Sequence, residues 1–226
     1  AIKDTLLTII NPDVEQTLNS FFMEPRKFDE KGQVFSQVLT IYDKILRIDP
    51  SFFKDNLIDK LFEHIGLYEE DRIDILFFLS NLVKFEQLTN YILENNLMTQ
   101  VFNVDEKVYC FIDLLSDMTY NEKENALITI LTIIYYEPEK TFAEILEQNF
   151  LNVIYDSIDN CYSGTNSYFL RMFLCTLQVL LKNYQNLLEN IDSDSVLECL
   201  TNLSEDSIDI GINQFAQALK DEYFSE

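Results

Sequence analysis

The residue types that carry most protein chemistry are sparse in this chain of 226 residues. His64 is its one histidine, and it stands beside Glu63 near the end of a predicted helix. A satisfied or solvated imidazole is expected there, rather than a catalytic base. One histidine without a CxxC pair leaves no zinc-binding set, and four scattered glycines cannot form a loop that cradles phosphate. The sequence therefore predicts no enzyme, no bound metal and no cofactor.

The four cysteines show no metal-binding spacing. They are Cys110, Cys161, Cys175 and Cys199. All except Cys161 lie inside apolar runs, where a reduced cysteine behaves as a small buried hydrophobic residue. A disulfide framework is unusual in a chain of this length with so many core residues. We therefore expect a reducing compartment, the cytoplasm or the nucleus.

Carboxylates are abundant, and the net charge is −23. Through Lys84 the chain has 10 basic and 15 acidic residues, net −5, and from Phe85 onward it has 6 basic and 24 acidic residues, net −18. Such a field repels phosphate backbones and anionic lipid, which argues against nucleic-acid binding and membrane binding. A basic peptide or a basic protein face would be attracted. The alternative is an acidic surface that serves solubility alone.

No targeting or membrane-spanning segment is apparent in the sequence. The N-terminus lacks the basic and apolar regions of a signal peptide. The longest apolar run, "ALITILTIIYY" at 126–136, is shorter than the ~20 residues of a membrane helix. We expect no membrane insertion. Because the sequence begins with Ala, it is also compatible with a fragment of a longer protein.

Helical periodicity extends over most of the chain, and strand-type alternation is hard to find. The predicted helices cover 33–48, 53–65, 72–84, 121–136 and 167–183. The first has apolar residues at three- and four-residue steps: Val34, Val38, Ile41, Ile45 and Ile48. Gly66 stands where a glycine would end the second helix, and Asn121 with Glu124 resembles a capping box. The pattern predicts an all-α fold.

One phrase is repeated along the chain. "ILENNLMTQVF" at 92–102 matches "ILEQNFLNVIY" at 145–155, "FFKDNLIDKLF" at 52–62 aligns with both, and "LLEN" at 187–190 opens a fourth copy. The copies start 40, 53 and 42 residues apart, and periods near 40 are typical of helical solenoid repeats. An extra helix at 108–119 would explain the longest interval.

The phrase has an asparagine at the same place in three copies, at positions 56, 96 and 149. A helix that ends there must turn sharply before the next apolar run. Such a turn usually needs a residue in the left-handed region, where asparagine is second only to glycine. The pattern therefore predicts a left-handed turn at each asparagine.

The segments 79–102, 130–158 and 177–200 resemble the armadillo-repeat family, and HEAT-type repeats share most of these features. The resemblance covers roughly 33–203. It implies a right-handed α-solenoid of about four to five repeats, which we expect to form a single domain over 1–226. By family, the third helices line a groove that binds extended peptides or proteins. Asn81 matches the asparagine of importin-α-type adaptors, but Phe77 replaces their tryptophan, so their usual recognition of nuclear-localisation peptides is not expected.

The sequence thus predicts a non-catalytic scaffold or adaptor that binds a basic or amphipathic segment of another protein. The alternative is a regulatory subunit or exchange factor that clamps a chaperone, phosphatase or kinase. The candidate groove residues are Phe77, Asn81, Lys84, Tyr135, Tyr136, Gln178 and Lys182. Exposed tyrosines would anchor a partner, although Phe77 and the two tyrosines fit a core equally well.

Overall fold

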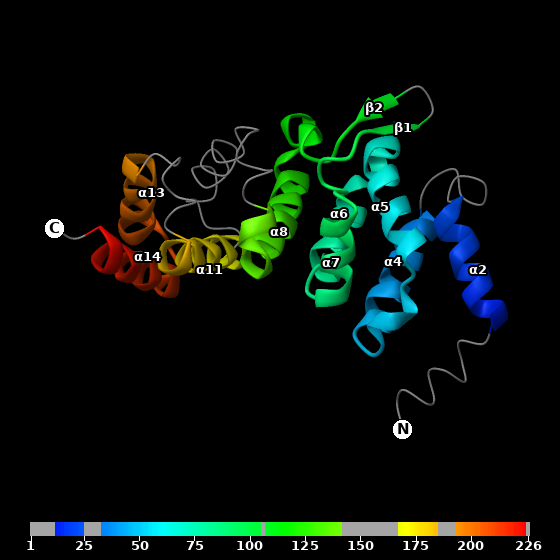
Figure 1. The fold of residues 1–226 in the computed structure, drawn as a ribbon, viewed down its shortest axis with the longest axis horizontal. Helices are drawn as coiled ribbons and strands as arrows, with labels where there is room; N and C mark the ends of the chain where they lie inside the picture. The colour runs from blue at the N-terminus through cyan, green and yellow to red at the C-terminus, as the bar shows by residue number, and fades with distance from the viewer. Residues whose placement is uncertain (1–11, 25–32, 105–106, 142–166, 185–192, 225–226) are drawn as a thin grey trace. The chain divides into compact units, whose positions relative to one another are not determined.

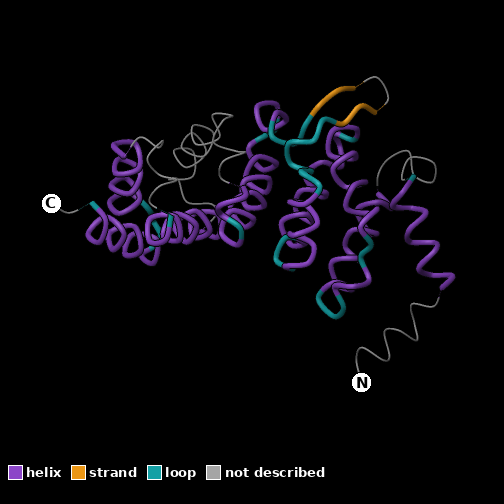
Figure 2. The backbone as a smooth tube through the Cα atoms, in the orientation of Figure 1, coloured by secondary structure: helices purple, strands orange, loops and turns teal. Residues whose placement is uncertain are grey.

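The computed structural model describes residues 12–24, 33–104, 107–141, 167–184 and 193–224. Within these ranges the chain is mostly helical, with one antiparallel pair of short strands (Figures 1 and 2). The predicted all-α class is confirmed at this level, because each strand has three residues. The chain divides into two compact units, Ala1–Asp117 and Met118–Glu226. The single domain over 1–226 stays a prediction.

The first unit contains α2 (Pro12–Met23), α4 (Gln33–Leu46), the 3₁₀ helix η1 (Pro50–Phe52), α5 (Asp55–Leu67), η2 (Glu69–Asp71), α6 (Arg72–Leu82), α7 (Glu86–Glu94), β1 (Phe102–Val104), β2 (Lys107–Tyr109) and η3 (Asp113–Asp117). The second unit contains α8 (Tyr120–Tyr136), α11 (Ser167–Asn183), α13 (Ser193–Asp206) and α14 (Ile210–Tyr223).

Aromatic side chains hold the helices of the first unit together. The ring of Phe22 on α2 lies 5.5–5.8 Å from the rings of Phe35, Tyr42 and Phe53, and Phe78 on α6 lies 5.5 Å from Phe53. Edge-to-face pairs at these distances add to the stabilisation from area burial alone. In this way α4 contacts both α2 and α6, and α5 contacts α2, α6 and α7.

The helix predicted at 33–48 is present as α4, but its buried face differs from the predicted stripe. Val38 and Ile45 are buried as expected, whereas Val34 and Ile41 are 36% and 43% exposed. The core side of α4 is completed by aromatic and leucine side chains that the predicted stripe left out: Phe35, Leu39, Tyr42 and Leu46. Rings bury more apolar area than β-branched side chains, so the face that carries them turns inward.

A β-hairpin replaces part of the extra helix predicted at 108–119. β2 occupies its start, a 3₁₀ helix follows at 113–117, and Tyr109 on β2 reaches back to α5. The Tyr109 hydroxyl donates to the carbonyl of Glu63, and a Cβ at Gly66 would overlap the Tyr109 ring. Gly66 lies inside α5, which ends at Leu67, so its predicted role as the terminating glycine is wrong. It makes room for the hairpin instead.

The left-handed turn predicted at Asn96 is confirmed. Asn96 has φ 52° and, among the described non-glycine residues, is the one with a positive φ. It follows α7, and the N–H of Leu97 bonds the carbonyl of Ile92 at 3.0 Å, as in a helix-terminating turn. The prediction is wrong for Asn56, which lies in the first turn of α5. Asn149 and the copies of the phrase at 145–155 and 187–190 lie outside the described residues.

In the second unit, α8 begins with a capping box about two turns ahead of its apolar run. The box is formed by Thr119 and Glu122, and the N–H of Thr119 donates to the Glu122 carboxylate at 2.7 Å. The predicted pair, Asn121 with Glu124, is therefore wrong by two residues. Residues 126–134 of α8 are buried, α11 contacts α8 and α14, and α13 contacts α14. The helix predicted at 167–183 is confirmed as α11.

Candidate functional site

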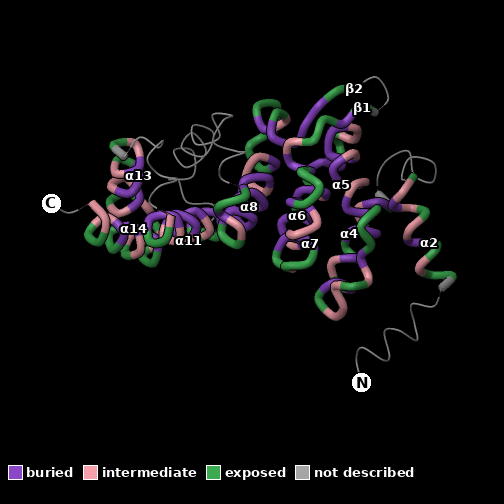
Figure 3. Tube along the Cα trace, in the orientation of Figure 1, coloured by how far each residue is buried: buried purple, intermediate pink, exposed green. Residues whose placement is uncertain are grey.

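Helix α6 is mostly buried (Figure 3), but one of its aromatic residues is exposed. Phe77 is 58% exposed, although its neighbours Leu76 and Phe78 are buried. Ile73, one turn earlier, is 39% exposed. Residues four apart share a helix face, so these two side chains form an apolar strip directed away from the core. Phe77 is therefore not a core residue, and its role as a groove residue stays a prediction.

Asn81 and Lys84 continue this strip with hydrogen-bonding groups. The Asn81 amide donates to the carbonyl of Phe77 at 3.1 Å, and Lys84 Nζ donates to Asn81 Oδ1 at 2.8 Å. Asn81 is half-buried and Lys84 is exposed. The structure therefore brings together Phe77, Asn81 and Lys84, the three candidates predicted in this unit. We define Ile73, Phe77, Asn81 and Lys84 as the α6 surface.

Charged groups at the C-terminal end of α4 act on the pKa of Lys84, at the end of the α6 surface. Arg47 Nε bonds Asp43 Oδ2 at 2.9 Å. Desolvation of the Lys84 ammonium, and then the positive charge of Arg47, lower the pKa of Lys84. Cations at a helix C-terminus offset the negative end of its dipole. The α6 surface thus combines an apolar strip with a cationic end, unlike the acidic average of the chain.

The remaining candidates lie in the second unit. Tyr135 and Tyr136 end α8 and are 38% and 50% exposed, with their rings 5.3 Å apart and nearly perpendicular. Lys182, on α11, is exposed and Gln178, one turn earlier, is half-buried. The two tyrosines meet each other, and the two α11 residues share a helix face.

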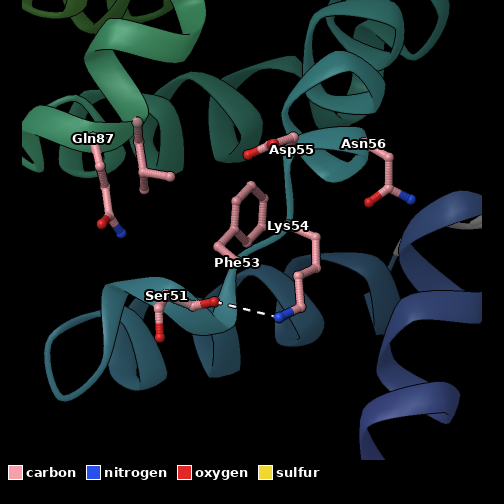
Figure 4. Close-up of a pocket in the computed structure, with 7 residues that line it drawn as sticks. Ser51, Phe53, Lys54, Asp55, Asn56 and Gln87 are labelled. Carbon is pink, nitrogen blue, oxygen red and sulfur yellow. Dashed lines mark hydrogen bonds between the residues drawn. The ribbon is translucent and has the colours of Figure 1, made fainter.

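A cavity of about 670 Å³ opens between the start of α5 and the start of α7 (Figure 4). Its lining comprises Ser51, Phe53, Lys54, Asp55, Asn56, Gln87 and Leu88. Lys54 Nζ is held 3.5 Å from the carbonyl of Ser51. The lining offers one carboxylate, one ammonium, one hydroxyl and two amides together with two apolar side chains, and no histidine or thiol. No local sequence pattern indicates this cavity, because its two sides lie more than thirty residues apart.

The described residues provide little that could carry catalysis. Cys110 and Cys199 are buried and Cys175 is half-buried, and burial raises the pKa of the Cys110 and Cys175 thiols, which disfavours the reactive thiolate. His64 is buried, with Nε2 2.8 Å from the carbonyl of Phe22. Within the described ranges, no group of three or more histidine, cysteine, aspartate or glutamate side chains could hold a metal ion.

None of the described helices has both the length and the hydropathy of a membrane span.

Comparisons of the chain with protein-family models, with curated proteins and with solved structures find no match.

Proposed function

We propose that this chain is a non-catalytic protein-interaction domain, an α-solenoid of the armadillo type that binds a segment of another protein through the α6 surface. The bound segment would place an apolar or aromatic side chain against Ile73 and Phe77. The observation that carries this proposal is the 58% exposure of Phe77 on a mostly buried helix. Fully burying a phenylalanine side chain contributes roughly 1.5–3 kcal/mol, and a partner that covers the exposed part of Phe77 would recover a share of that free energy.

The contacts within the first unit support the solenoid part of the proposal. α2 contacts α4 and α5 contacts α6, so these helices form two successive pairs. The pairs touch through equivalent helices, α2 against α5 and α4 against α6. A solenoid stacks its repeats in this way, each against its neighbour. On this reading α4 and α6 are successive third helices, the ones that line the groove in the armadillo family.

The exposed tyrosines of α8 and the cationic and amide side chains of α11 are proposed as further contact residues in the second unit. The carboxylates that predominate after Lys84 would favour basic side chains in the partner and speed its association. The cytoplasm or the nucleus remains the proposed location.

Site-specific photocrosslinking tests this function. A photoreactive phenylalanine analogue at position 77 should form an adduct with a partner in cells that express the domain. The same analogue at Val14, which is 38% exposed on α2, is the matched control. An adduct that is specific to position 77, and that forms again from the two purified proteins, supports the proposal. Equal yields at both positions, or no adduct at 77, would contradict it.

A further inference from the structure

The corner between α13 and α14 exposes two isoleucines. Ile208 and Ile210 are 75% and 72% exposed, the highest values among the large apolar side chains of the described residues. They flank Asp209, the residue that caps the N-terminus of α14. β-Branched apolar side chains have no advantage in a turn, so their presence at this corner calls for a reason.

The usual structural reason does not apply to them. An apolar residue just before an N-cap often packs against the fourth residue of the helix, as a hydrophobic staple. Here the residue before the cap is Ile208, and the fourth helical residue is Asn213, which is polar. The exposure of Ile208 agrees with the absence of that contact. Neither isoleucine therefore contributes much to holding the described part of the fold together.

The corner is nevertheless held firmly in place. Asp209 accepts from the N–H groups of Gly211 and Ile212 at 2.8 and 3.4 Å, and Arg171 on α11 bonds its other oxygen at 3.2 Å. The N–H of Asp209 donates to Ser207 Oγ at 3.3 Å. A Cβ at Gly211 would stand 3.1 Å from Arg171 Nη2. The glycine therefore leaves space for the contact between Arg171 and Asp209. A surface that is already ordered loses little entropy when a partner binds.

Acidic side chains surround the two isoleucines. From Ser193 to Phe224 the chain has seven acidic residues and one basic residue. Glu205 and Asp206 are exposed at the end of α13, next to the corner, whereas the charge of Asp209 is matched by Arg171. The corner thus presents an apolar pair beside two exposed carboxylates, for which the described residues provide no ion-pair partner.

We propose that this corner, defined by Glu205, Asp206, Ile208 and Ile210, is a second docking surface, for a basic amphipathic segment of another protein. The apolar face of that segment covers the two isoleucines, and its lysine or arginine side chains meet the two carboxylates. The charge complementarity selects this occupant over an acidic or purely apolar segment. It consists of other residues than the α6 surface, and its existence does not depend on the function proposed for that surface.

The test uses a fluorescent peptide with leucine and lysine at amphipathic helical spacing, and a second peptide with glutamate in place of lysine. Fluorescence anisotropy at about 0.15 M salt measures binding to the whole chain. The lysine peptide should bind and the glutamate peptide should not. Ile208→Ser/Ile210→Ser and Glu205→Lys/Asp206→Lys should each weaken binding of the lysine peptide about tenfold.

Two matched controls separate this site from general attraction to an acidic protein. Asp221→Lys/Glu222→Lys makes the same charge change at the far end of α14, and Val108→Ser removes an apolar side chain that is 67% exposed on β2. Both should change affinity by less than about twofold. Controls that weaken binding as much as the corner variants would overturn the proposal. So would a wild-type dimer in light scattering that Ile208→Ser/Ile210→Ser converts to monomer, because a second copy would then cover the corner.

Discussion

Asn96 shows how far a single residue type can be interpreted from sequence. Its place in a repeated phrase, between an apolar helix and an apolar run, predicted a left-handed turn, and its φ of 52° agrees. The same prediction is wrong for Asn56, which lies in the first turn of α5. Asparagine is also common near helix starts, and the phrase alone does not distinguish the two positions.

Substitutions at Asn96 should separate backbone strain from side-chain contacts. Asn96→Val should lower the free energy of unfolding by about 1–2 kcal/mol, because a β-branched side chain is strained at positive φ. Asn96→Gly should be nearly neutral, since glycine adopts this conformation freely. Chemical denaturation of both variants measures the difference. Equal losses would show that the Asn96 side chain, rather than its backbone conformation, matters.

Gly66 was recognised from sequence as a special position, but for the wrong reason. Its place near the end of a periodic run suggested a helix terminator. The actual cause is the ring of Tyr109, 43 residues later in the sequence. Tertiary contacts of this kind leave no local signal. Phe77 is a similar case, because periodicity places it on α6 without showing whether its face is covered.

Gly66→Ala should destabilise the chain by about 1–3 kcal/mol, because the added methyl group overpacks against Tyr109. In a Tyr109→Ala background the same substitution should cost little or should stabilise, since alanine favours a helix over glycine by up to ~1 kcal/mol. Urea unfolding of wild type, the two single variants and the double variant measures the coupling free energy between the two positions. Additive effects would mean that the ring and the glycine do not meet.

The helices were easier to predict than the hairpin. Long amphipathic or fully apolar runs such as α11 have a clear period, and its limits matched the prediction. β1 and β2 have three residues each, too few for alternation to be recognised. The sequence between them, Asp-Glu, lacks the Asn-Gly or Asp-Gly signal of tight hairpins. The candidate sites divide in the same way. Residues 77, 81 and 84 follow from helix spacing, whereas the cavity between α5 and α7 and the α13–α14 corner depend on tertiary contacts.

The bridge from α11 to the α13–α14 corner should be pH-dependent. The Ser167 hydroxyl, the Gly211 N–H and the Arg171 guanidinium lower the pKa of Asp209. Ionised Asp209 therefore stabilises the fold above the unfolded pKa of about 4, and this contribution is lost as the pH falls through the folded pKa. Asp209→Asn keeps the cap but lacks the charge. The gap in unfolding free energy between wild type and this variant should shrink on acidification, as measured by urea titrations at several pH values. A gap that is constant with pH would contradict this account.

The charge of the whole chain sets its response to salt. The net charge is −23, so the acidic side chains repel one another in the folded state and destabilise it. Raising ionic strength from about 0.05 to 0.5 M shortens the Debye length from roughly 14 to 4 Å. The thermal midpoint should therefore rise with salt, and the rise should be smaller for a variant with Asp221, Glu222, Glu205 and Asp206 changed to their amides. Midpoints that do not depend on salt would show that ion pairs compensate the excess charge.

The central claim is that the α6 surface binds another protein. Its most direct test is the dissociation constant of the purified partner that crosslinks at position 77, measured with wild type, Phe77→Ala and the control Val14→Ala. Phe77→Ala should weaken binding at least about tenfold, or ~1.4 kcal/mol, with circular dichroism unchanged, and Val14→Ala should bind as wild type does. If Phe77→Ala and wild type have the same dissociation constant, the α6 surface is not the site of recognition.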